Sequence, residues 1–348
     1  MIHRVIISRN IAHSLIEGIQ MVQADHIFLL MDETTQQACF PLVKDSPALE
    51  EFTPIVIGAT DTHKTLDTLA KVWTELGNGG GTRHSLLVNL GGGMVTDLGG
   101  FAASTFKRGI PYINVPTTLL SMVDASVGGK TGINFNGLKN EVGVFNNPTA
   151  TFIATEFLRT LDHENILSGY AEMLKHGLIS TNEHFAELLN FDLDDIDYGL
   201  LGDMVGRSVE IKEHIVEEDP LEHGIRKALN LGHTAGHAFE SWALTRKPCL
   251  HGYAVAWGLI CELYLSCIKT QFPTDKMRQA VRFIKENYGI LPITCDDYEE
   301  LYNYMTHDKK NIAGSINFTL LGDVGDIRIN QTASKEEIFE MLDFLRES

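Results

Sequence analysis

The chain has 348 residues, of which 44% are hydrophobic, and a formal net charge of −18 at pH 7. This length suits two domains better than one. The negative charge disfavours nucleic acids and anionic membranes as partners. No stretch approaches the run of about 20 apolar residues that crosses a bilayer, and the N-terminal segment lacks the features of a signal peptide. We therefore expect a cytoplasmic protein that binds neither nucleic acid nor membrane.

The five cysteines form no CxxC pair and are odd in number. This pattern argues against a disulfide framework and against a zinc site built from cysteines. A phosphate site on so acidic a chain requires Lys and Arg gathered in one place.

The first part of the chain alternates short β-rich runs with helical patterns. Strands are predicted at His26–Met31, Ile55–Ile57, Ser85–Leu90 and Tyr112–Val115, with a helix over Thr65–Leu76. This alternation is typical of βαβ units and a mostly parallel sheet. We expect an α/β, Rossmann-like nucleotide-binding domain over residues 1–158.

After about Thr155 helical patterns dominate. The predicted helices cover His163–Ile179, Asp203–Glu218, Ile225–Leu244, Tyr253–Thr270, Thr274–Asn287 and Ser334–Arg346. A short β-like pair, Ile316–Leu321 and Asp326–Ile329, precedes the last helix. The second domain, residues 159–348, is therefore expected to be mainly α-helical.

The predicted strand SLLVNL runs directly into Gly91, Gly92 and Gly93, and a helical pattern follows. A strand, a glycine turn and a helix N-terminus together form a phosphate-binding device. The turn departs from GxGxxG, because Thr96 occupies the third glycine position, and a tight turn without a ligand is an equal alternative. Asp97 is either a site residue or a surface acid. Asp32, after the strand HIFLLM, suits a ribose hydroxyl, although a helix N-cap or turn role is commoner.

Residues 115–143 form a polar, glycine-rich segment that contains Asp124, Lys130, Lys139 and Asn140. Its GGKT sequence resembles the end of a Walker A motif, but Asp124 replaces the first glycine of that motif, so we reject an NTPase. A loop with these cations and many free N–H groups suits an anionic, hydroxyl-rich ligand. The alternative is a mobile surface loop with ordinary lysines.

The strongest local signal is a polar stripe formed by Arg226, Asn230, His233 and His237. Their spacing of 4, 3 and 4 places them within an arc of about 60° on one helix face. Histidines at i and i+4 can share a metal ion, although two separately hydrogen-bonded histidines are commoner.

Further candidate ligands lie in two other segments, and one of them, His251, follows in LHGYAVAWG. GYAEMLKHG carries Glu172 and Lys175 on one helix face. Glu172 and two histidines would complete a catalytic zinc site, but the spacing does not choose between His233 and His237.

Taken together, these segments resemble the 3-dehydroquinate synthases, within the sugar phosphate cyclase superfamily. GGGMVTDLGGFAAST, RGIPYINVPTTLLSMVDASVGGKTGIN, LKN, GYAEMLKHG, RKALNLGHTAGHAFE, LHGYAVAWG and HDKKN occur in the family's order, over about residues 26–311. The resemblance implies the family reaction, in which 3-deoxy-D-arabino-heptulosonate 7-phosphate becomes 3-dehydroquinate and phosphate. That reaction oxidises an alcohol with NAD, eliminates phosphate, reduces the ketone again and closes a ring by aldol addition.

The resemblance also implies roles for single residues. Glu172, His233 and His251 would hold Zn²⁺ or Co²⁺. The NAD contacts would be Asp32, Asp61, Lys64, Gly91, Gly92, Gly93, Met94, Asp97, Thr117, Thr118, Asp124 and Lys139. The substrate would meet Lys130, Asn140, Lys175, Lys212, Arg226, Asn230, His237 and Lys309, and Arg108 would reach its phosphate across a homodimer interface.

Two positions depart from the family pattern. Asp61 and Lys64 lie in GATDTHK, where the family usually has Glu in a GExxK motif, so cofactor affinity is expected to differ. Leu138-Lys139-Asn140 replaces the usual GKN, with Gly137 displaced by one position. This displacement is expected to alter the backbone of that loop.

Three other functions are compatible with parts of the pattern. A cyclase that makes an inosose or a valiolone is disfavoured, because Arg226 suits a substrate that carries a carboxylate. A metal-dependent polyol dehydrogenase shares the glycine turn and histidines but lacks GGKTGIN and LKN. A non-catalytic NAD-binding protein is expected to have lost Lys130, Lys175 or a metal ligand, and all of these are present.

Overall fold

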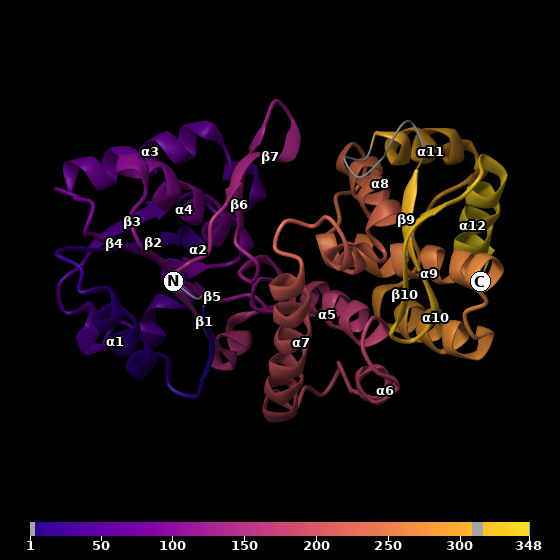
Figure 1. The fold of residues 1–348 in the computed structure, drawn as a ribbon, viewed down its shortest axis with the longest axis horizontal. Coiled ribbons are helices and arrows are strands. Elements are labelled where there is room, and N and C mark those ends of the chain that lie inside the picture. Colours follow the sequence, from indigo (N-terminus) through magenta and orange to yellow (C-terminus); the bar gives the residue numbers. More distant parts are fainter. Residues whose placement is uncertain (1–3, 308–315, 348) are drawn as a thin grey trace. The chain divides into compact units, whose positions relative to one another are not determined.

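A computed structural model describes residues 4–307 and 316–347 of the chain. It divides into two compact units, Met1–Asp162 and His163–Ser348, whose elements are labelled in Figure 1. The boundary that the sequence predicts, between residues 158 and 159, falls inside the short 3₁₀ helix η6 (Thr155–Thr160). The fold class is the predicted one: a Rossmann-like α/β unit followed by a mainly helical unit.

The N-terminal unit contains a six-stranded, wholly parallel sheet in the order β1-β8-β5-β4-β2-β3. Its strands are β1 (Arg4–Ser8), β2 (Ile27–Asp32), β3 (Thr53–Ile57), β4 (Leu86–Gly91), β5 (Tyr112–Pro116) and β8 (Ala150–Ala154), and its α-helices are α1 (Ile11–Val22), α2 (Glu33–Ala38), α3 (Leu66–Asn78) and α4 (Gly93–Thr105). Strands β4, β5 and β8 are buried along their whole lengths, as expected for a parallel sheet covered on both faces.

Helices cover the two faces of this sheet. Leu87 and Tyr112 are paired in the register and pack in one apolar cluster with α3 and α4. Ile113, the next position on β5, points to the opposite face, where α1 lies against it (Figure 1). The approach of α1 is close, since a Cβ on Gly18 would lie 3.2 Å from Ile113.

The strand order creates a switch point beside β4. The chain proceeds from β2 to β3 on one side and from β4 to β5 on the other, while β2 and β4 are hydrogen-bonded neighbours. Ligands of open α/β sheets bind at the carboxyl ends of the strands at such a point. Asp32 and Gly91 are the last residues of these two strands.

The segment predicted as a lysine-rich loop is instead an antiparallel hairpin. Strands β6 (Lys130–Phe135) and β7 (Leu138–Phe145) are joined by Asn136 and Gly137, both with positive φ (50° and 79°). Two central residues with positive φ are typical of the type I′ turn that links two strands in register. Gly137 therefore serves the hairpin turn.

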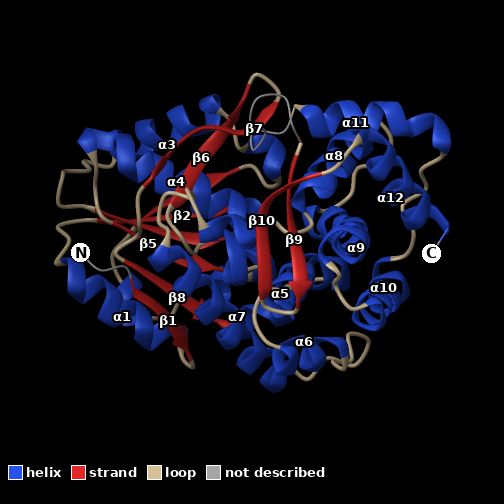
Figure 2. Cartoon of the chain, turned by 45° about the vertical axis from the view of Figure 1, so that its right-hand side comes forward, coloured by secondary structure: helices blue, strands red, loops and turns tan. Residues whose placement is uncertain are grey.

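The C-terminal unit is helical around α9, with a two-stranded antiparallel sheet (Figure 2). Its elements are α5 (His163–Leu178), α6 (Asn182–Leu189), α7 (Tyr198–Glu218), α8 (His233–Leu244), α9 (His251–Thr270), α10 (Thr274–Tyr288), α11 (Tyr298–Thr306), β9 (Asn317–Asp323), β10 (Asp326–Thr332) and α12 (Lys335–Glu347). Helices α5, α8, α10 and α12 and strand β9 all contact α9. In the described ranges, no helix has both the length and the apolarity of a membrane span.

The single helix predicted over Ile225–Leu244 is wrong. The structure has a 3₁₀ helix, η7 (Ile225–Asn230), then an extended Leu231 and a left-handed Gly232 (φ 80°), before α8 begins at His233. A Cβ on Gly232 would lie 2.9 Å from Leu259 and 3.1 Å from the Val255 carbonyl oxygen, so both the conformation and the close approach favour glycine. The shared helix face inferred for Arg226, Asn230, His233 and His237 therefore does not exist.

Candidate active site

The glycine turn lies at the start of α4. Gly91 ends β4, Gly92 precedes the helix without a side-chain cap, and the amide of Thr117 donates to the Gly91 carbonyl at 3.0 Å. A Cβ on Gly92 would lie 3.1 Å from Thr118, and one on Gly93 would lie 3.2 Å from the Ala125 Cβ. Because Gly92 and Gly93 have no side chains, a ligand can approach the backbone here. The N–H groups of the first turn of α4 have no partner within the helix and lie at its positive end.

Asp32 adopts the turn role that the sequence favoured. It is the N-cap of α2, and its Oδ1 accepts from the amides of Thr34 and Thr35 at 2.8 Å each. Its position at the end of β2 places it next to the strand that leads into the glycine turn.

A cluster of ionic and amide side chains lies between α4 and the hairpin. The buried Lys64 ammonium lies 2.5 Å from Asp97 Oδ2 and 2.5 Å from Asn140 Oδ1. Asp61 accepts from the Asn134 amide at 3.0 Å and lies 3.7 Å from Lys139. Burial raises the pKa of the Asp97 carboxyl, although the charge of Lys64 favours its ionised form.

Other candidates of the N-terminal unit occupy turns and strand ends. Asp124 lies in the short π-helix η5 (Ser121–Ala125), and Lys130 is the exposed first residue of β6. Arg108 is exposed in the connection between α4 and β5, with φ at 70°. Met94, in the first turn of α4, is half-buried.

Glu172, His233 and His251 come together in the C-terminal unit, each with a ligand atom within 4.8 Å of the others. Glu172 lies in α5, while His233 and His251 are the first residues of α8 and α9. Glu172 Oε1 lies 3.3 Å from His233 Nε2 and 3.4 Å from His251 Nε2. The carboxylate is fully buried, and Lys175 forms an ion pair with it.

Hydrogen bonds orient both imidazole rings of this cluster. His233 Nδ1 lies 3.0 Å from the Leu231 carbonyl oxygen, and His251 Nδ1 lies 3.3 Å from Glu240 Oε2. Both partners are acceptors, so each Nδ1 carries a hydrogen and each Nε2 is directed toward Glu172, where it would be the atom that binds a cation. Three electron-pair donors that face one another in a buried place suit a cation.

Charges in the cluster are strongly coupled. Burial disfavours the ionised Glu172, but Lys175 and His233 outweigh it and hold the pKa of that carboxyl well below its usual range. Burial likewise opposes charge on His251, but hydrogen bonds with Glu172 and Glu240 raise its pKa to about 10.

His237 lies beside this cluster, with its ring centroid 5.4 Å from His233 and 6.0 Å from His251. It belongs to none of the groups of three converging donors found among the described residues. The spacing in the sequence did not decide whether His233 or His237 is the candidate metal ligand. In the structure His233, and not His237, converges with Glu172 and His251.

The remaining polar candidates of this unit surround the η7 segment. Arg226 is 2% exposed, its Nη1 donates to the Pro220 carbonyl at 2.5 Å, and its backbone amide donates to Asp219. Asn230 donates to Glu222 at 2.9 Å. Lys212 is buried on α7. Lys309 lies outside the described residues.

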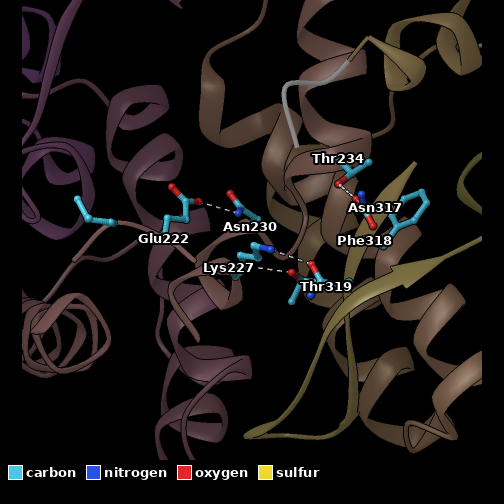
Figure 3. Close-up of a pocket in the computed structure, with 9 residues that line it drawn as sticks. Glu222, Lys227, Asn230, Thr234, Asn317, Phe318 and Thr319 are labelled. Carbon is cyan, nitrogen blue, oxygen red and sulfur yellow. Dashed lines mark hydrogen bonds between the residues drawn. The ribbon is translucent and has the colours of Figure 1, made fainter. Parts of the chain in front are cut away.

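A pocket of about 360 Å³ opens beside η7 (Figure 3). Asn230 and Thr234 line it from one side, and Asn317, Thr319 and Asn330 of β9 and β10 complete it. Leu221 and Phe318 also line the pocket, which therefore combines apolar surface with a few amide and hydroxyl groups, as is usual for a small-molecule site.

Three acids bind residues of the candidate site without being predicted to do so; from the sequence, Glu222 is considered only as a structural partner of Arg226. Glu240 orients His251, Glu222 binds Asn230, and Glu262 accepts backbone hydrogen bonds at the start of α8. Only Glu262 carries a sequence signal, because it is a lone acid in the otherwise apolar run of α9, and a buried charge needs partners.

Comparison with known proteins decides the family. The N-terminal model of 3-dehydroquinate synthase matches residues 54–168, and the C-terminal model matches residues 169–311. A 3-dehydroquinate synthase of Parabacteroides distasonis is 57% identical over 346 residues, which cover 99% of this chain and 98% of that protein. This chain belongs to the 3-dehydroquinate synthase family. It is a lyase-type cyclase of the shikimate pathway.

Solved structures agree on the fold. The chain is similar to 2-epi-5-epi-valiolone synthase from Streptomyces hygroscopicus, solved with NAD⁺ and Zn²⁺ bound, at a TM-score of 0.85 and 25% identity over 99% of this chain and 97% of that one. It is also similar to a 2-deoxy-scyllo-inosose synthase complexed with carbaglucose-6-phosphate, NAD⁺ and Co²⁺ (TM-score 0.84, 23% identity, 98% and 95% coverage). The second likeness shows the fold alone.

Proposed function

We propose that the chain converts 3-deoxy-D-arabino-heptulosonate 7-phosphate to 3-dehydroquinate and phosphate with one bound NAD and one divalent metal ion, Zn²⁺ or Co²⁺. The observation that carries the metal assignment is the convergence of Glu172, His233 and His251. The two structural relatives solved with NAD⁺ and either Zn²⁺ or Co²⁺ support the choice of cofactors.

The donor set fits a catalytic metal ion. One carboxylate and two imidazoles match the three protein ligands of a site that keeps an open position for substrate, and the Nδ1 contacts leave each Nε2 available. Glu172, His233 and His251 would hold the cation, which would supply Lewis-acid polarisation of the reacting hydroxyl and lower the cost of its deprotonation. The buried Lys175 beside Glu172 supplies a positive charge next to the same place.

The glycine turn fits a dinucleotide. Gly91–Gly93 open the backbone at the switch point of the sheet, where first-turn amides suit a pyrophosphate. Bound NAD supplies a hydride acceptor that returns the hydride within the same turnover. We assign the NAD contacts predicted from the sequence to this end of the sheet, with Met94, Thr117, Thr118 and Asp124 beside the turn. Asp61 would act through Lys139 and Asn134.

The carboxylate of the proposed substrate needs a cationic partner that can form two hydrogen bonds with it. We assign Arg226 to the carboxylate, because a planar fork binds a carboxylate through two hydrogen bonds. Asn230, four positions later in the chain, lines the pocket beside η7. This assignment favours a phosphorylated keto acid over a sugar phosphate that has no carboxylate. We also propose substrate contacts for Lys130, Asn140, Lys175, Lys212, His237 and Lys309.

We further propose that the chain acts as a homodimer in the cytoplasm, with Arg108 reaching a phosphate in the partner's site. The hairpin supports an association surface, because Val142 and Val144 of β7 are 40% and 39% exposed. In the register of the hairpin they lie opposite Ile133, which is buried in the cluster with α3 and α4, and Thr131, so the exposed apolar positions of this face are on β7. Exposed apolar rows of this kind mark contact surfaces.

The metal assignment is tested by His251→Ala. The substitution removes one of three ligands, so purified protein is expected to lose most of its zinc while still binding NAD⁺ through the other unit. Metal analysis and NAD⁺ titration measure the two properties separately. Full zinc retention in the folded variant would refute the assignment, and His214→Ala, which removes an exposed histidine of α7, serves as the control.

A further inference from the structure

Glu262 is a buried acid that the proposed chemistry does not use. It lies in α9, eleven positions after His251, with no exposed surface. Its neighbours Cys261 and Leu263 are also fully buried. An ionised carboxylate in such surroundings is tolerated only where several donors compensate the loss of water.

The compensating donors are backbone amides of another helix. Glu262 Oε2 accepts from the Gly232 amide at 2.7 Å, and Oε1 accepts from the amides of Thr234 and Ala235 at 2.9 Å and 3.3 Å. The first N–H groups of a helix have no partner within the helix, and the Gly232 cap position offers no side chain. Glu262 therefore caps α8 from a neighbouring helix.

The capped turn contains a proposed metal ligand. His233 lies between Gly232 and Thr234, the two residues whose amides Glu262 holds most closely. The helices also meet at glycines here, because a Cβ on Gly258 would lie 1.9 Å from the Gly232 carbonyl oxygen. One carboxylate thus joins the start of the helix that begins with His233 to the helix that begins with His251.

We propose that Glu262 is a positioning residue for the metal site: its carboxylate fixes the first turn of α8 against α9 and so sets the separation of the two histidine ligands. The proposal rests on the metal site assigned above. A charge-assisted hydrogen bond to each of the flanking amides fixes the backbone on both sides of His233, which a side chain packed by apolar contacts alone would not do.

The test is the zinc affinity of the metal-free protein, measured by competition with a chelating dye. Glu262→Gln keeps the size of the side chain but replaces one acceptor oxygen with a donor that faces backbone N–H groups. We expect the dissociation constant for Zn²⁺ to rise by about 10- to 100-fold, as is typical when the support of a ligand is removed. NAD⁺ affinity is expected to stay unchanged.

A matched control separates positioning from loss of stability. Asp197 caps α7 with the same chemistry, accepting from the amides of Gly199 and Leu200 at 2.8 Å and 3.0 Å, but α7 carries none of the three ligands. Asp197→Ala removes the accepting oxygen, so it is expected to lower the melting temperature and leave zinc affinity within about twofold. Glu262→Asp retains the charge on a shorter arm, so its zinc affinity is expected to fall between wild type and Glu262→Gln; it replaces Glu262→Gln should that variant not fold.

The outcomes distinguish this inference from the assignment on which it rests. Zinc affinity that is unchanged in folded Glu262→Gln, or in Glu262→Asp when it serves as the replacement, overturns the positioning role while the metal site stands. An equal loss of affinity in Asp197→Ala overturns it as well, because loss of stability alone would then suffice. Retention of zinc by His233→Ala overturns the metal site itself.

Discussion

At the scale of single residues, the metal site depends on what binds the Nδ1 atom of each histidine. A backbone carbonyl holds His233, whereas the Glu240 carboxylate holds His251. A carboxylate partner increases the basicity of the opposite ring nitrogen more than a carbonyl does. His251 should therefore be the stronger donor of the two imidazoles.

Arg226 gives the sharpest test of substrate choice. Arg226→Lys removes the planar fork, so we expect substrate binding to weaken by roughly 1.5–3 kcal/mol, or about ten- to more than a hundredfold in kcat/KM. Zinc content and NAD⁺ affinity should stay normal, because neither depends on this side chain. Steady-state kinetics with the heptulosonate phosphate, beside a thermal melt, measure the effect.

A structural role for Arg226 makes a different prediction. Its bond to the Pro220 carbonyl would be lost in the variant, so the melting temperature would fall while the folded fraction turned over normally. Unchanged kcat/KM would therefore remove the reason for assigning the carboxylate to Arg226. Arg246→Lys is the control, because it removes the same fork from an exposed ion pair with Glu300.

The sequence named candidate residues for the site but not their arrangement. Resemblance to the family named Glu172, His233 and His251, and the structure brings these three together. The 4-3-4 spacing alone did not separate His233 from His237, because it assumed one continuous helix. Glu240 and Glu222 follow no local pattern, since their partners lie 11 and 8 residues away in the sequence.

At the scale of elements, two glycines explain the main errors. The period of Arg226, Asn230 and His233 is compatible with a 3₁₀ turn followed by a new helix, and the left-handed Gly232 makes that break. Asn136-Gly137 between β-rich runs is a strong hairpin signal that the lysine-rich composition obscured. Strands β1 and β8 were not predicted, because short apolar runs carry no period that identifies a strand.

The hairpin also leads to a test of assembly. The wild-type chain is expected to sediment at twice its mass of 38.6 kDa. Val142→Lys combined with Val144→Lys should raise the dimer dissociation constant at least about tenfold, because the added charges would be desolvated at the interface or repel one another there. Both positions are partly exposed, so the fold of the monomer should persist.

Sedimentation of the wild type also tests the dimer itself. A chain that stays monomeric at all concentrations would refute the homodimer. Unchanged association of the double variant would refute only the role of β7. Met21→Lys combined with Leu42→Lys provides the same change in charge at exposed apolar positions elsewhere.

At the scale of the whole molecule, the chain has a net charge of −18 and yet buries several cationic side chains. Lys64, Lys175, Lys212 and Arg226 are all buried. Lys64 and Lys175 each face an acid of the proposed cofactor or metal site. Buried cations gathered at the proposed sites are how an acidic protein would bind a phosphorylated keto acid.

The most direct test of the proposed function follows phosphate and NADH together. With the heptulosonate phosphate, Zn²⁺ and catalytic amounts of NAD⁺, we predict release of one phosphate per substrate consumed, with no accumulation of NADH. Phosphate release should stop when either the metal or NAD⁺ is removed. Stoichiometric NADH without phosphate would contradict the account, because it would identify a dehydrogenase built on the same fold.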